Sequence, residues 1–407
     1  MPFEIPESWE WTRVGEVSDT CLGKMLDKQK NQGTNQFYLR NINVRWEGFE
    51  LTDLLQMPFE ANENERYSIN YGDLVVCEGG EPGRCAVWDK QESIKFQKAL
   101  HRVRCHRGII NHYIQYVLKY LSTNGLLDDY FTGSTIKHLT GKALNSVLIP
   151  LPPTSEQIRI VSVLKKWITL LEDLEIIKND LQETIKRTKN KVLSLAISGK
   201  LVQQDSNDEP SIELLKRINP NYVPCCDTSH YGKLPSTWCV VKIGDVYDHT
   251  TGKALKKSNN DGVLRRYITT SNLYWNSFDL TEVRSMYFTD RELDKCTAKK
   301  GDLLVCNGGD VGRAAIWNND EDICIQNHIS RLRPKYDSIV NNLFCCYIFM
   351  YLKQKKKLNG KGVAITSLSA TDLLSVPIPL PPINEQNRIV QTIQNIENKL
   401  NEITAEL

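Results

Sequence analysis

Residues 73–88 read DLVVCEGGEPGRCAVW, and residues 302–317 read DLLVCNGGDVGRAAIW. The two phrases share an apolar run, a Gly-Gly pair, a Gly-Arg pair and a closing Trp, at positions 229 residues apart. Each phrase predicts a buried strand, a tight glycine turn and a second strand. A phrase that occurs twice indicates an internal duplication, which would preserve the same offset elsewhere in the chain.

The offset of 229 positions recurs from one end of the chain to the other. Near the start of each copy, Ile5-Pro6 and Trp9 correspond to Leu234-Pro235 and Trp238. Further along, five identical residues recur at the same offset: Tyr38 and Tyr267, Trp46 and Trp275, Gln97 and Gln326, Arg102 and Arg331, and Arg104 and Arg333. Near the end of each copy, IPLPP at 149–153 returns at 378–382, and EQIRIV at 156–161 returns as EQNRIV at 385–390. The chain is therefore a tandem duplication with almost no net insertion between its copies.

The composition is that of an ordinary globular protein. The chain has 407 residues, of which 41% are hydrophobic and 25% are charged, and this length suggests two or three domains. The N-terminal MPFEIPESWE has neither the basic flank nor the apolar core of a secretory signal. The longest apolar stretch, residues 343–352, is about half of the ~20 residues that a membrane-spanning helix needs. We expect a cytoplasmic protein without membrane association.

Cysteines and net charge restrict the chemistry further. None of the twelve cysteines forms a C-x-x-C pair, and Cys77, Cys306 and Cys324 lie in apolar, strand-like runs. Reduced, buried thiols are therefore a better interpretation than metal ligands, and we expect no metal site. The formal net charge of +2 is low for a protein that binds DNA by itself. Contacts with nucleic acid would have to come from local patches or from a partner.

Each copy has the pattern of a strand-rich α/β (α+β) domain with mixed sheets. Short apolar runs are separated by Gly, Asn and Asp clusters, and helices are predicted at 113–121 and 343–352. We place the first domain at residues 1–153 and the second at 234–382. A polar, turn-rich linker at 201–233 is expected to hold one short helix, at 211–218.

Long helices are predicted after each LPP, at 154–200 and 383–407. Ser155 and Asn384 are candidate N-caps, and heptad spacing of apolar residues is typical of helices that pack in antiparallel coiled-coil fashion. About 44 residues at 1.5 Å each span about 66 Å, on the order of two DNA turns of about 34 Å each. A solvated structural bundle is the alternative. Partner contacts are expected at Leu164, Trp167, Leu171, Leu174, Leu181, Ile393, Ile396 and Leu400.

The two helices differ in length. Only 25 residues follow Pro382, whereas 46 positions separate Pro153 from Gly199, a plausible helix terminator.

No motif of an enzyme is present in the sequence. We find no phosphate loop, nucleophile elbow, zinc helix or dinucleotide loop, and no Asn/Asp-Pro-Pro-aromatic tetrapeptide of the kind that holds a flipped base. We therefore expect no catalytic residue and no cofactor in this chain. The glycines at 79–83 fit a strand-to-strand turn, while Arg84 and Arg313 are left with two interpretations, phosphate contact or structural ion pair.

A recognition surface is the remaining candidate site. YLRNINVRW at 38–46 and YITTSNLYW at 267–275 keep aromatic ends but differ between them. Arg, Asn and Thr are side chains that contact base edges in a groove, so each copy would recognise a different sequence; variable solvent-facing positions are the alternative. The candidate DNA contacts are Arg40, Asn41, Asn43 and Arg45 in the first copy, and Thr269, Thr270, Asn272 and Tyr274 in the second.

A second contrast precedes each closing strand. GSTIKHL at 133–139 corresponds to GVAITSL at 362–368, which follows a basic run at 353–361. We expect Lys137 and His138, and in the second copy Lys355 and Lys356, to contact DNA, with a solvated helix end as the alternative for the basic run.

These features together resemble the DNA specificity subunit of type I restriction-modification systems. The resemblance rests on two offset-matched domains, each closed by IPLPP-x-x-EQ, and on a helix that ends in AISGKLV at 196–202. It implies that each copy is a target recognition domain for one half of a bipartite DNA site, and that the helices pair as a ruler for the spacer in a pseudo-twofold protein. Two modification subunits, carrying S-adenosylmethionine and N6-adenine methyltransferase chemistry, would dock on the helices. Restriction subunits that use ATP and Mg would join them.

Three other functions are compatible with parts of the pattern. A specificity subunit of a type IIB-like restriction system would share the DNA-binding domains. A coiled-coil scaffold would use only the heptad helices, and a self-contained DNA-modifying enzyme is disfavoured because the cofactor motifs are missing.

Overall fold

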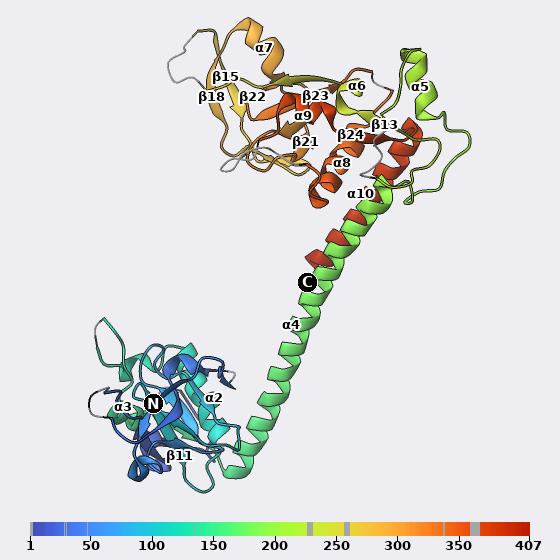
Figure 1. Cartoon of the computed structure of the whole chain (residues 1–407). Coiled ribbons are helices and arrows are strands. Elements are labelled where there is room, and N and C mark those ends of the chain that lie inside the picture. Colours follow the sequence, from blue (N-terminus) through green and yellow to red (C-terminus); the bar gives the residue numbers. More distant parts are fainter. Residues whose placement is uncertain are drawn as a thin grey trace. The chain divides into compact units, whose positions relative to one another are not determined.

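The computed structural model describes residues 3–407 except 28, 30, 47, 134, 226–230, 256–260, 337 and 359–366. The chain divides into two compact units, Met1–Glu175 and Ile176–Leu407, which contain the blue-to-teal and the yellow-to-red domains of Figure 1. The division falls within helix α4 (Thr154–Ile197).

The first unit is built from three small sheets and a two-stranded ribbon. The sheets have the strand orders β1-β12, β6-β3-β10-β7 and β2-β11-β8-β9, and the ribbon is β4-β5. The strands are β1 (Glu10–Arg13), β2 (Ser18–Leu22), β3 (Thr34–Leu39), β4 (Val44–Arg45), β5 (Gly48–Phe49), β6 (Leu55–Phe59), β7 (Ser68–Ile69), β8 (Leu74–Cys77), β9 (Cys85–Val87), β10 (Ile94–Phe96), β11 (Leu100–Cys105) and β12 (Leu148–Leu151). The helices are α1 (Val14–Val17), α2 (Asn111–Thr123) and α3 (Gly141–Ser146), with 3-10 turns η1 (Asn41–Asn43), η2 (Ala61–Glu63) and η3 (Asp128–Tyr130).

The second unit repeats this topology. Its sheets have the orders β13-β24, β18-β15-β22-β19 and β14-β23-β20-β21, and its ribbon is β16-β17. The strands are β13 (Cys239–Lys242), β14 (Tyr247–Thr251), β15 (Val263–Ile268), β16 (Leu273–Tyr274), β17 (Ser277–Phe278), β18 (Arg284–Phe288), β19 (Thr297–Ala298), β20 (Leu303–Cys306), β21 (Ala314–Ile316), β22 (Ile323–Ile325), β23 (Ile329–Pro334) and β24 (Pro377–Leu380). The helices are α5 (Ser211–Ile218), α6 (Ile243–Val246), α7 (Asp290–Cys296), α8 (Asn342–Gln354), α9 (Ala370–Ser375) and α10 (Ile383–Ala405).

The predicted fold class is confirmed. The LVVC and LLVC of the two phrases form the fully buried strands β8 and β20. The sheets are mixed, since β10 pairs with β3 in parallel and with β7 antiparallel. The corresponding strand β22 pairs with β15 and β19 in the same two ways. The internal duplication is therefore a duplication of one fold.

A buried carboxylate explains the aspartate that opens each phrase. Asp73 is 4% exposed, and its two oxygens accept hydrogen bonds from Nε and Nη2 of Arg104 at 2.8 and 2.7 Å. Arg333 binds Asp302 in the same bidentate way, at 2.7 and 2.6 Å. Because a buried carboxylate needs both a counter-charge and hydrogen bonds, the pair fixes β8 against β11, and β20 against β23.

A buried glutamine explains the motif that closes each copy. In the first unit, β12 pairs antiparallel with β1, and the chain then enters α4. Gln157 accepts a hydrogen bond from the Ile110 N–H at 2.9 Å and donates to the Pro152 carbonyl at 2.9 Å. Gln386 makes the corresponding bonds to Asn341 and Pro381 at 2.8 and 2.9 Å. The EQ of each motif thus fastens the first turn of the long helix to its domain.

The cysteines lie mostly inside the two cores. Burial raises the pKa of Cys77 to about 11 and the pKa of Cys306 to about 11, so both are neutral thiols at pH 7. Every cysteine that the structure describes is free. Within that same part of the chain, no helix is both long and apolar enough to cross a membrane.

Replacing Gln157 with Ala should lower the free energy of unfolding of the first unit by about 1–3 kcal/mol, because the Ile110 N–H is left without its acceptor. Urea unfolding of the full chain would measure this change. Gln182→Ala, at an exposed position of the same helix, is the control and should leave the transition unchanged. Equal midpoints for the two variants would contradict this role of Gln157.

Candidate nucleic-acid interface

Three segments distant in sequence meet at the glycine turn between β8 and β9. The Asn41 side chain donates to the Gly79 carbonyl at 3.1 Å, and the Leu139 N–H donates to the Glu78 carbonyl at 2.8 Å. The turn at 78–84 therefore joins the loop at 40–45 to the segment at 132–139.

The two adjacent glycines permit this approach. A Cβ on Gly79 would lie 3.1 Å from Nδ1 of His138, and a Cβ on Gly80, whose φ is +83°, would lie 2.5 Å from Nδ2 of Asn41. A side chain at either position would press into a neighbouring segment, and at Gly80 it would also strain the backbone. The Gly-Gly pair is therefore required by the meeting of the segments at this strand-to-strand turn.

The second unit has the same arrangement. The Leu368 N–H donates to the Asn307 carbonyl at 2.8 Å, and Gly308 pairs with Ser367 in an isolated antiparallel bridge. Residues 362–366 of the predicted recognition segment, and Lys361 of the basic run, lie outside the described residues.

Arg84 and Arg313 stabilise this arrangement. Nη2 of Arg84 donates to the Asn41 carbonyl at 3.0 Å, and its Nη1 pairs with Glu81. Nη2 of Arg313 donates to the Thr270 carbonyl at 2.5 Å, and its Nη1 lies 3.6 Å from Asp310. The side chains of Arg84 and Arg313 are only 16% and 18% exposed. Of the two interpretations left by the sequence, the geometry favours the structural ion pair.

Asn43 and Asn272 are also built into the loops. Asn43 is 1% exposed; its Oδ1 accepts from the Arg40 N–H at 2.9 Å and its Nδ2 donates to the Glu50 carbonyl at 3.0 Å. Asn272 accepts from the Thr269 N–H at 2.9 Å and donates to the Asp279 carbonyl at 3.0 Å. Neither amide is directed to solvent, so each holds the loop that carries its neighbours.

Arg40 has a partner within the unit as well. Its Nη2 lies 2.7 Å from both the carbonyl and the carboxylate of Asp53. The guanidinium is 20% exposed and Asp53 is 65% exposed, so the pair lies at the surface and contributes little stability by itself. A base or phosphate would have to displace Asp53 to reach the whole of this guanidinium.

Other candidates are exposed around the turns. In the first unit these are Arg45, which donates to the Ile42 carbonyl at 2.6 Å, His138, and Lys137, which lies 3.1 Å from Asp128. In the second unit, Tyr274 is 47% exposed and lies under the guanidinium of Arg313 at 5.4 Å. Thr269 and Thr270 are half-buried.

The basic run begins beside the second turn. Nζ of Lys353 donates to the Val311 carbonyl at 2.8 Å and lies 2.8 Å from Asp310. Lys355 and Lys356 follow and are exposed. The start of the basic run therefore lies beside the turn between β20 and β21.

His328 is a candidate that the sequence did not indicate. A Cβ on Gly308 would lie 3.0 Å from Nδ1 of His328, so His328 lies beside the second turn as His138 lies beside the first. The two histidines come from different segments, because the 229-residue offset relates His328 to Ala99. The duplication therefore does not relate these two histidines to each other.

The predicted partner residues divide into exposed and buried groups. On α4, Trp167, Leu171 and Leu174 are 58%, 61% and 52% exposed, whereas Leu164 and Leu181 are half-buried. On α10, Ile393 is 2% exposed, and Ile396 and Leu400 are half-buried. Trp167, Leu171 and Leu174 are therefore accessible to a partner, whereas Ile393 is part of the core of the second unit.

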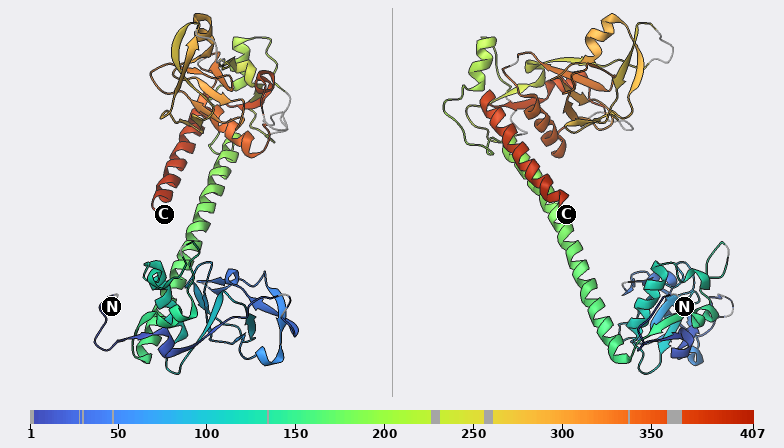
Figure 2. Two further views of the ribbon diagram at one scale, coloured as in Figure 1. Left: turned by 90° about the vertical axis from the view of Figure 1, so that its left-hand side faces the viewer. Right: turned by 180° about the vertical axis from the view of Figure 1, so that it is seen from behind.

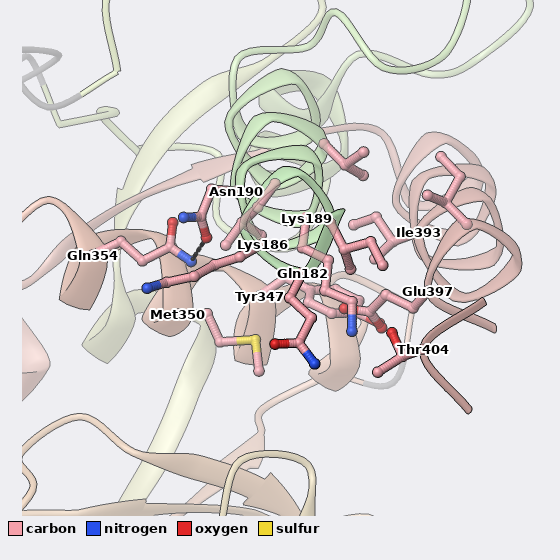
Figure 3. A pocket seen from close by; sticks show the side chains of 14 residues that line it. Gln182, Lys186, Lys189, Asn190, Tyr347, Met350, Gln354, Ile393, Glu397 and Thr404 are labelled. Atoms are coloured by element: carbon pink, nitrogen blue, oxygen red, sulfur yellow. Dashed lines mark hydrogen bonds between the residues drawn. The ribbon is translucent and has the colours of Figure 1, made fainter. Parts of the chain in front are cut away.

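Within the second unit, α10 runs antiparallel along the end of α4 (Figure 2). Lys178 donates to the Leu407 carbonyl at 2.5 Å, and Lys189 donates to Asn401 at 2.7 Å. The later residue of α4 thus contacts the earlier residue of α10, as in an antiparallel pair. Between these helices and α8 is a pocket of about 430 Å³, lined by Ile185, Leu193, Ile393 and Ile396 among others (Figure 3). Tyr347 donates to Glu397 there at 3.1 Å, and burial raises the pKa of Glu397.

Known proteins share this organisation. A family model for the type I restriction modification DNA specificity domain matches residues 6–187 and 235–407, once on each copy. The chain is 25% identical to the type I restriction enzyme EcoBI specificity subunit of Escherichia coli, over 93% of this chain and 80% of that protein. It is 22% identical to the MjaVIII specificity subunit of Methanocaldococcus jannaschii, over 97% and 88%. The crystal structure of the HsdS subunit from Thermoanaerobacter tengcongensis has the same fold, with a TM-score of 0.66 at 20% identity, and the match covers 100% of this chain and 93% of that one.

Asn43→Ala should lower the free energy of unfolding of the first unit by about 1–3 kcal/mol, since it removes the partner of the Arg40 N–H and of the Glu50 carbonyl. The exposed Asn35→Ala is the matched control and should change it by less than about 0.5 kcal/mol. Urea denaturation would measure both. A stable Asn43→Ala variant with altered DNA preference would show instead that this amide contacts bases.

Proposed function

The chain belongs to the family of DNA specificity subunits of type I restriction-modification systems, and on this premise we propose that each unit binds one half of a bipartite site in double-stranded DNA. The family match covers both copies. Each copy also has its own glycine turn at which three segments of the chain meet. The chain therefore has two separate candidate surfaces for DNA.

One observation carries the proposal: the two turns share a framework and differ in what they expose. The framework consists of the Gly-Gly pair, the arginines Arg84 and Arg313, and the amides Asn43 and Asn272. Around it, Asn41 corresponds to Thr270, Ile42 to Ser271 and Arg45 to Tyr274. Asn typically forms hydrogen bonds with adenine and Arg with guanine, whereas Thr and Ser can contact either base. The two half-sites should therefore differ in sequence.

The proposed contacts are side chains around the two turns that are exposed or, for Asn41 and Thr270, half-buried. In the first unit we assign base or phosphate contact to Asn41, Arg45, Lys137 and His138, and in the second to Thr270, Tyr274, His328, Lys355 and Lys356. Arg40 can join them only by leaving Asp53. Arg84, Arg313, Asn43, Asn272 and the Thr269 hydroxyl, which hydrogen-bonds to Asn272 at 3.0 Å, are positioning groups.

We assign catalysis to partner subunits. Methyl transfer with S-adenosylmethionine would belong to two modification subunits, and ATP- and Mg-dependent cleavage to restriction subunits. The missing cofactor motifs and the low net charge of this chain support this division of labour. The partner subunits would supply much of the positive charge that attracts DNA. This chain would determine which bases are recognised and how far apart the two half-sites lie.

Helix α4 is the proposed docking surface for the modification subunits and the spacer element. Its 44 residues correspond to about 66 Å at 1.5 Å per residue. The apolar side chains of Trp167, Leu171 and Leu174 are all more than half exposed. A contiguous exposed apolar surface of this kind is typical of a protein interface.

His138→Ala should relax recognition of one half-site, by about 1–3 kcal/mol for each base that the side chain would otherwise recognise. The expected result, from genome-wide adenine methylation mapping in cells that express the chain with its modification subunit, is a degenerate position in one half-site and an unchanged second half. His328→Ala should affect the other half. The control is Lys142→Ala, at an exposed position of α3. An equal effect on both half-sites would contradict the assignment of one unit to each half.

Trp167→Glu combined with Leu171→Glu should reduce copurification of the modification subunit at least tenfold, because charges replace apolar side chains at the interface. The circular dichroism spectrum should not change, since both side chains are exposed. Glu175→Gln on the same helix is the control. Undiminished copurification of the double variant would exclude this helix surface as the docking site.

A further inference from the structure

In the second unit, a hollow of about 450 Å³ lies beside the loop that carries Thr270 and Tyr274. Two segments line it, the loop itself and the turn at 279–284, which leads into β18. The lining residues used below are Thr269 and Ser271 from the loop, and Asp279, Thr281, Glu282 and Arg284 from the turn. The hollow is therefore continuous with the surface to which we assign DNA contact.

The turn that lines the hollow has the same framework in both copies. Asn272 donates to the carbonyls of Asp279 and Glu282, at 3.0 and 2.9 Å, and Asn43 binds the two corresponding carbonyls at 3.0 and 3.3 Å. The Asp279 carboxylate accepts from the N–H and the hydroxyl of Thr281, at 3.0 and 2.6 Å. The corresponding atoms of the first unit are 3.1 and 2.7 Å apart. The other side chains of the two turns can thus be compared position by position.

In the first unit, an arginine occupies the acidic side chain of this turn. Nη2 of Arg40 lies 2.7 Å from both the carbonyl and the carboxylate of Asp53. Two residues further along stands Leu55, which is 45% exposed. Its apolar side chain offers no hydrogen bond to a ligand. The first unit therefore presents a paired carboxylate and an apolar neighbour at this place.

In the second unit, both of these positions have changed. Thr269 stands where the first unit has Arg40, and its hydroxyl is used within the loop, by Ser271 at 2.7 Å and by Asn272 at 3.0 Å. Arg284 stands where the first unit has Leu55. Among the residues that the structure describes, the exposed side chains of Glu282 and Arg284 have neither a hydrogen bond nor an ion pair. The hollow thus presents one free acceptor group and one free donor group.

A free carboxylate beside a free guanidinium is complementary to one kind of base-pair edge. In the major groove, cytosine presents its N4 amino group as a donor, and guanine presents O6 and N7 as acceptors. Carboxylates accept from cytosine N4, and arginine donates to both guanine atoms. A backbone phosphate would be attracted by Arg284 but repelled by Glu282. The pair therefore favours a base edge over the DNA backbone.

We propose that Glu282 and Arg284 together specify a C·G base pair in the half-site that the second unit binds. This inference rests on the proposed function, because it requires that the second unit bind DNA. Glu282 would accept a hydrogen bond from cytosine N4, and Arg284 would donate to guanine O6 and N7. The first unit makes no such contact, because Arg40 holds Asp53 and Leu55 has no donor.

The test is the binding of duplexes by the complex of this chain with its modification subunit. Methylation mapping first gives the bipartite motif, and each C·G pair of both half-sites is then replaced in turn by T·A. Competition measured by fluorescence anisotropy should show a position, in one half-site only, at which the replacement weakens binding at least about tenfold. Glu282→Ala and Arg284→Ala should each abolish the discrimination at that same position.

Matched controls and the failed outcomes separate this inference from the function on which it rests. Arg291→Ala and Asp294→Ala, at exposed positions of α7 outside the hollow, should keep the discrimination. A bipartite preference that Glu282→Ala and Arg284→Ala both leave intact would overturn the inference and leave the proposed function standing. A wild-type complex without any sequence preference would overturn both. Equal weakening on all duplexes by Arg284→Ala would indicate a phosphate contact and would also overturn the inference.

A transplant into the first unit tests the same chemistry by gain of function. The triple variant Arg40→Thr, Asp53→Glu and Leu55→Arg copies the hollow, and it should add a preference for C·G of at least about tenfold in the other half-site. The last two substitutions without Arg40→Thr should not, because the arginine still occupies the carboxylate. Urea unfolding checks that the triple variant is folded. A folded triple variant with wild-type preferences would contradict the proposal.

Discussion

The close approach of three segments at a glycine turn is the constraint on which the recognition surface depends. Gly79 and Gly80 leave room for His138 and Asn41 because neither has a Cβ, and Gly308 leaves the same room for His328. Arg84 and Arg313 then hold the neighbouring loop by its main-chain carbonyl. Since these contacts involve backbone atoms, the exposed side chains can change while the framework persists, which is what the two copies display.

Much of the fold could be predicted from the sequence because duplication makes the structural positions visible. Residues retained at the 229-residue offset, such as Asp73 and Asp302 or Gln157 and Gln386, are those with buried polar partners. The long helix and the short linker helix follow equally from local patterns, heptad spacing and Gly termination.

The individual site residues could not be predicted in the same way. Arg40 and Asn43 have the side-chain chemistry that recognises bases, yet Arg40 pairs with Asp53, and Asn43 bonds to Glu50 and to the main chain of Arg40. These partners are set by the tertiary fold of the loop, and no local pattern indicates them. His328 was missed for the opposite reason, because its spatial counterpart His138 comes from a segment that the offset does not align with it. The duplication therefore identifies the framework more reliably than the surface it supports.

The linker between the two copies closes onto the second unit through its side chains. The Gln204 amide donates to Glu385, and Arg388 binds both oxygens of Asp208, at 2.6 and 3.4 Å. Because these residues belong to one chain, the contacts are intramolecular and do not change with protein concentration. Dilution therefore leaves this part of the linker in place, as it does any other element of the folded unit.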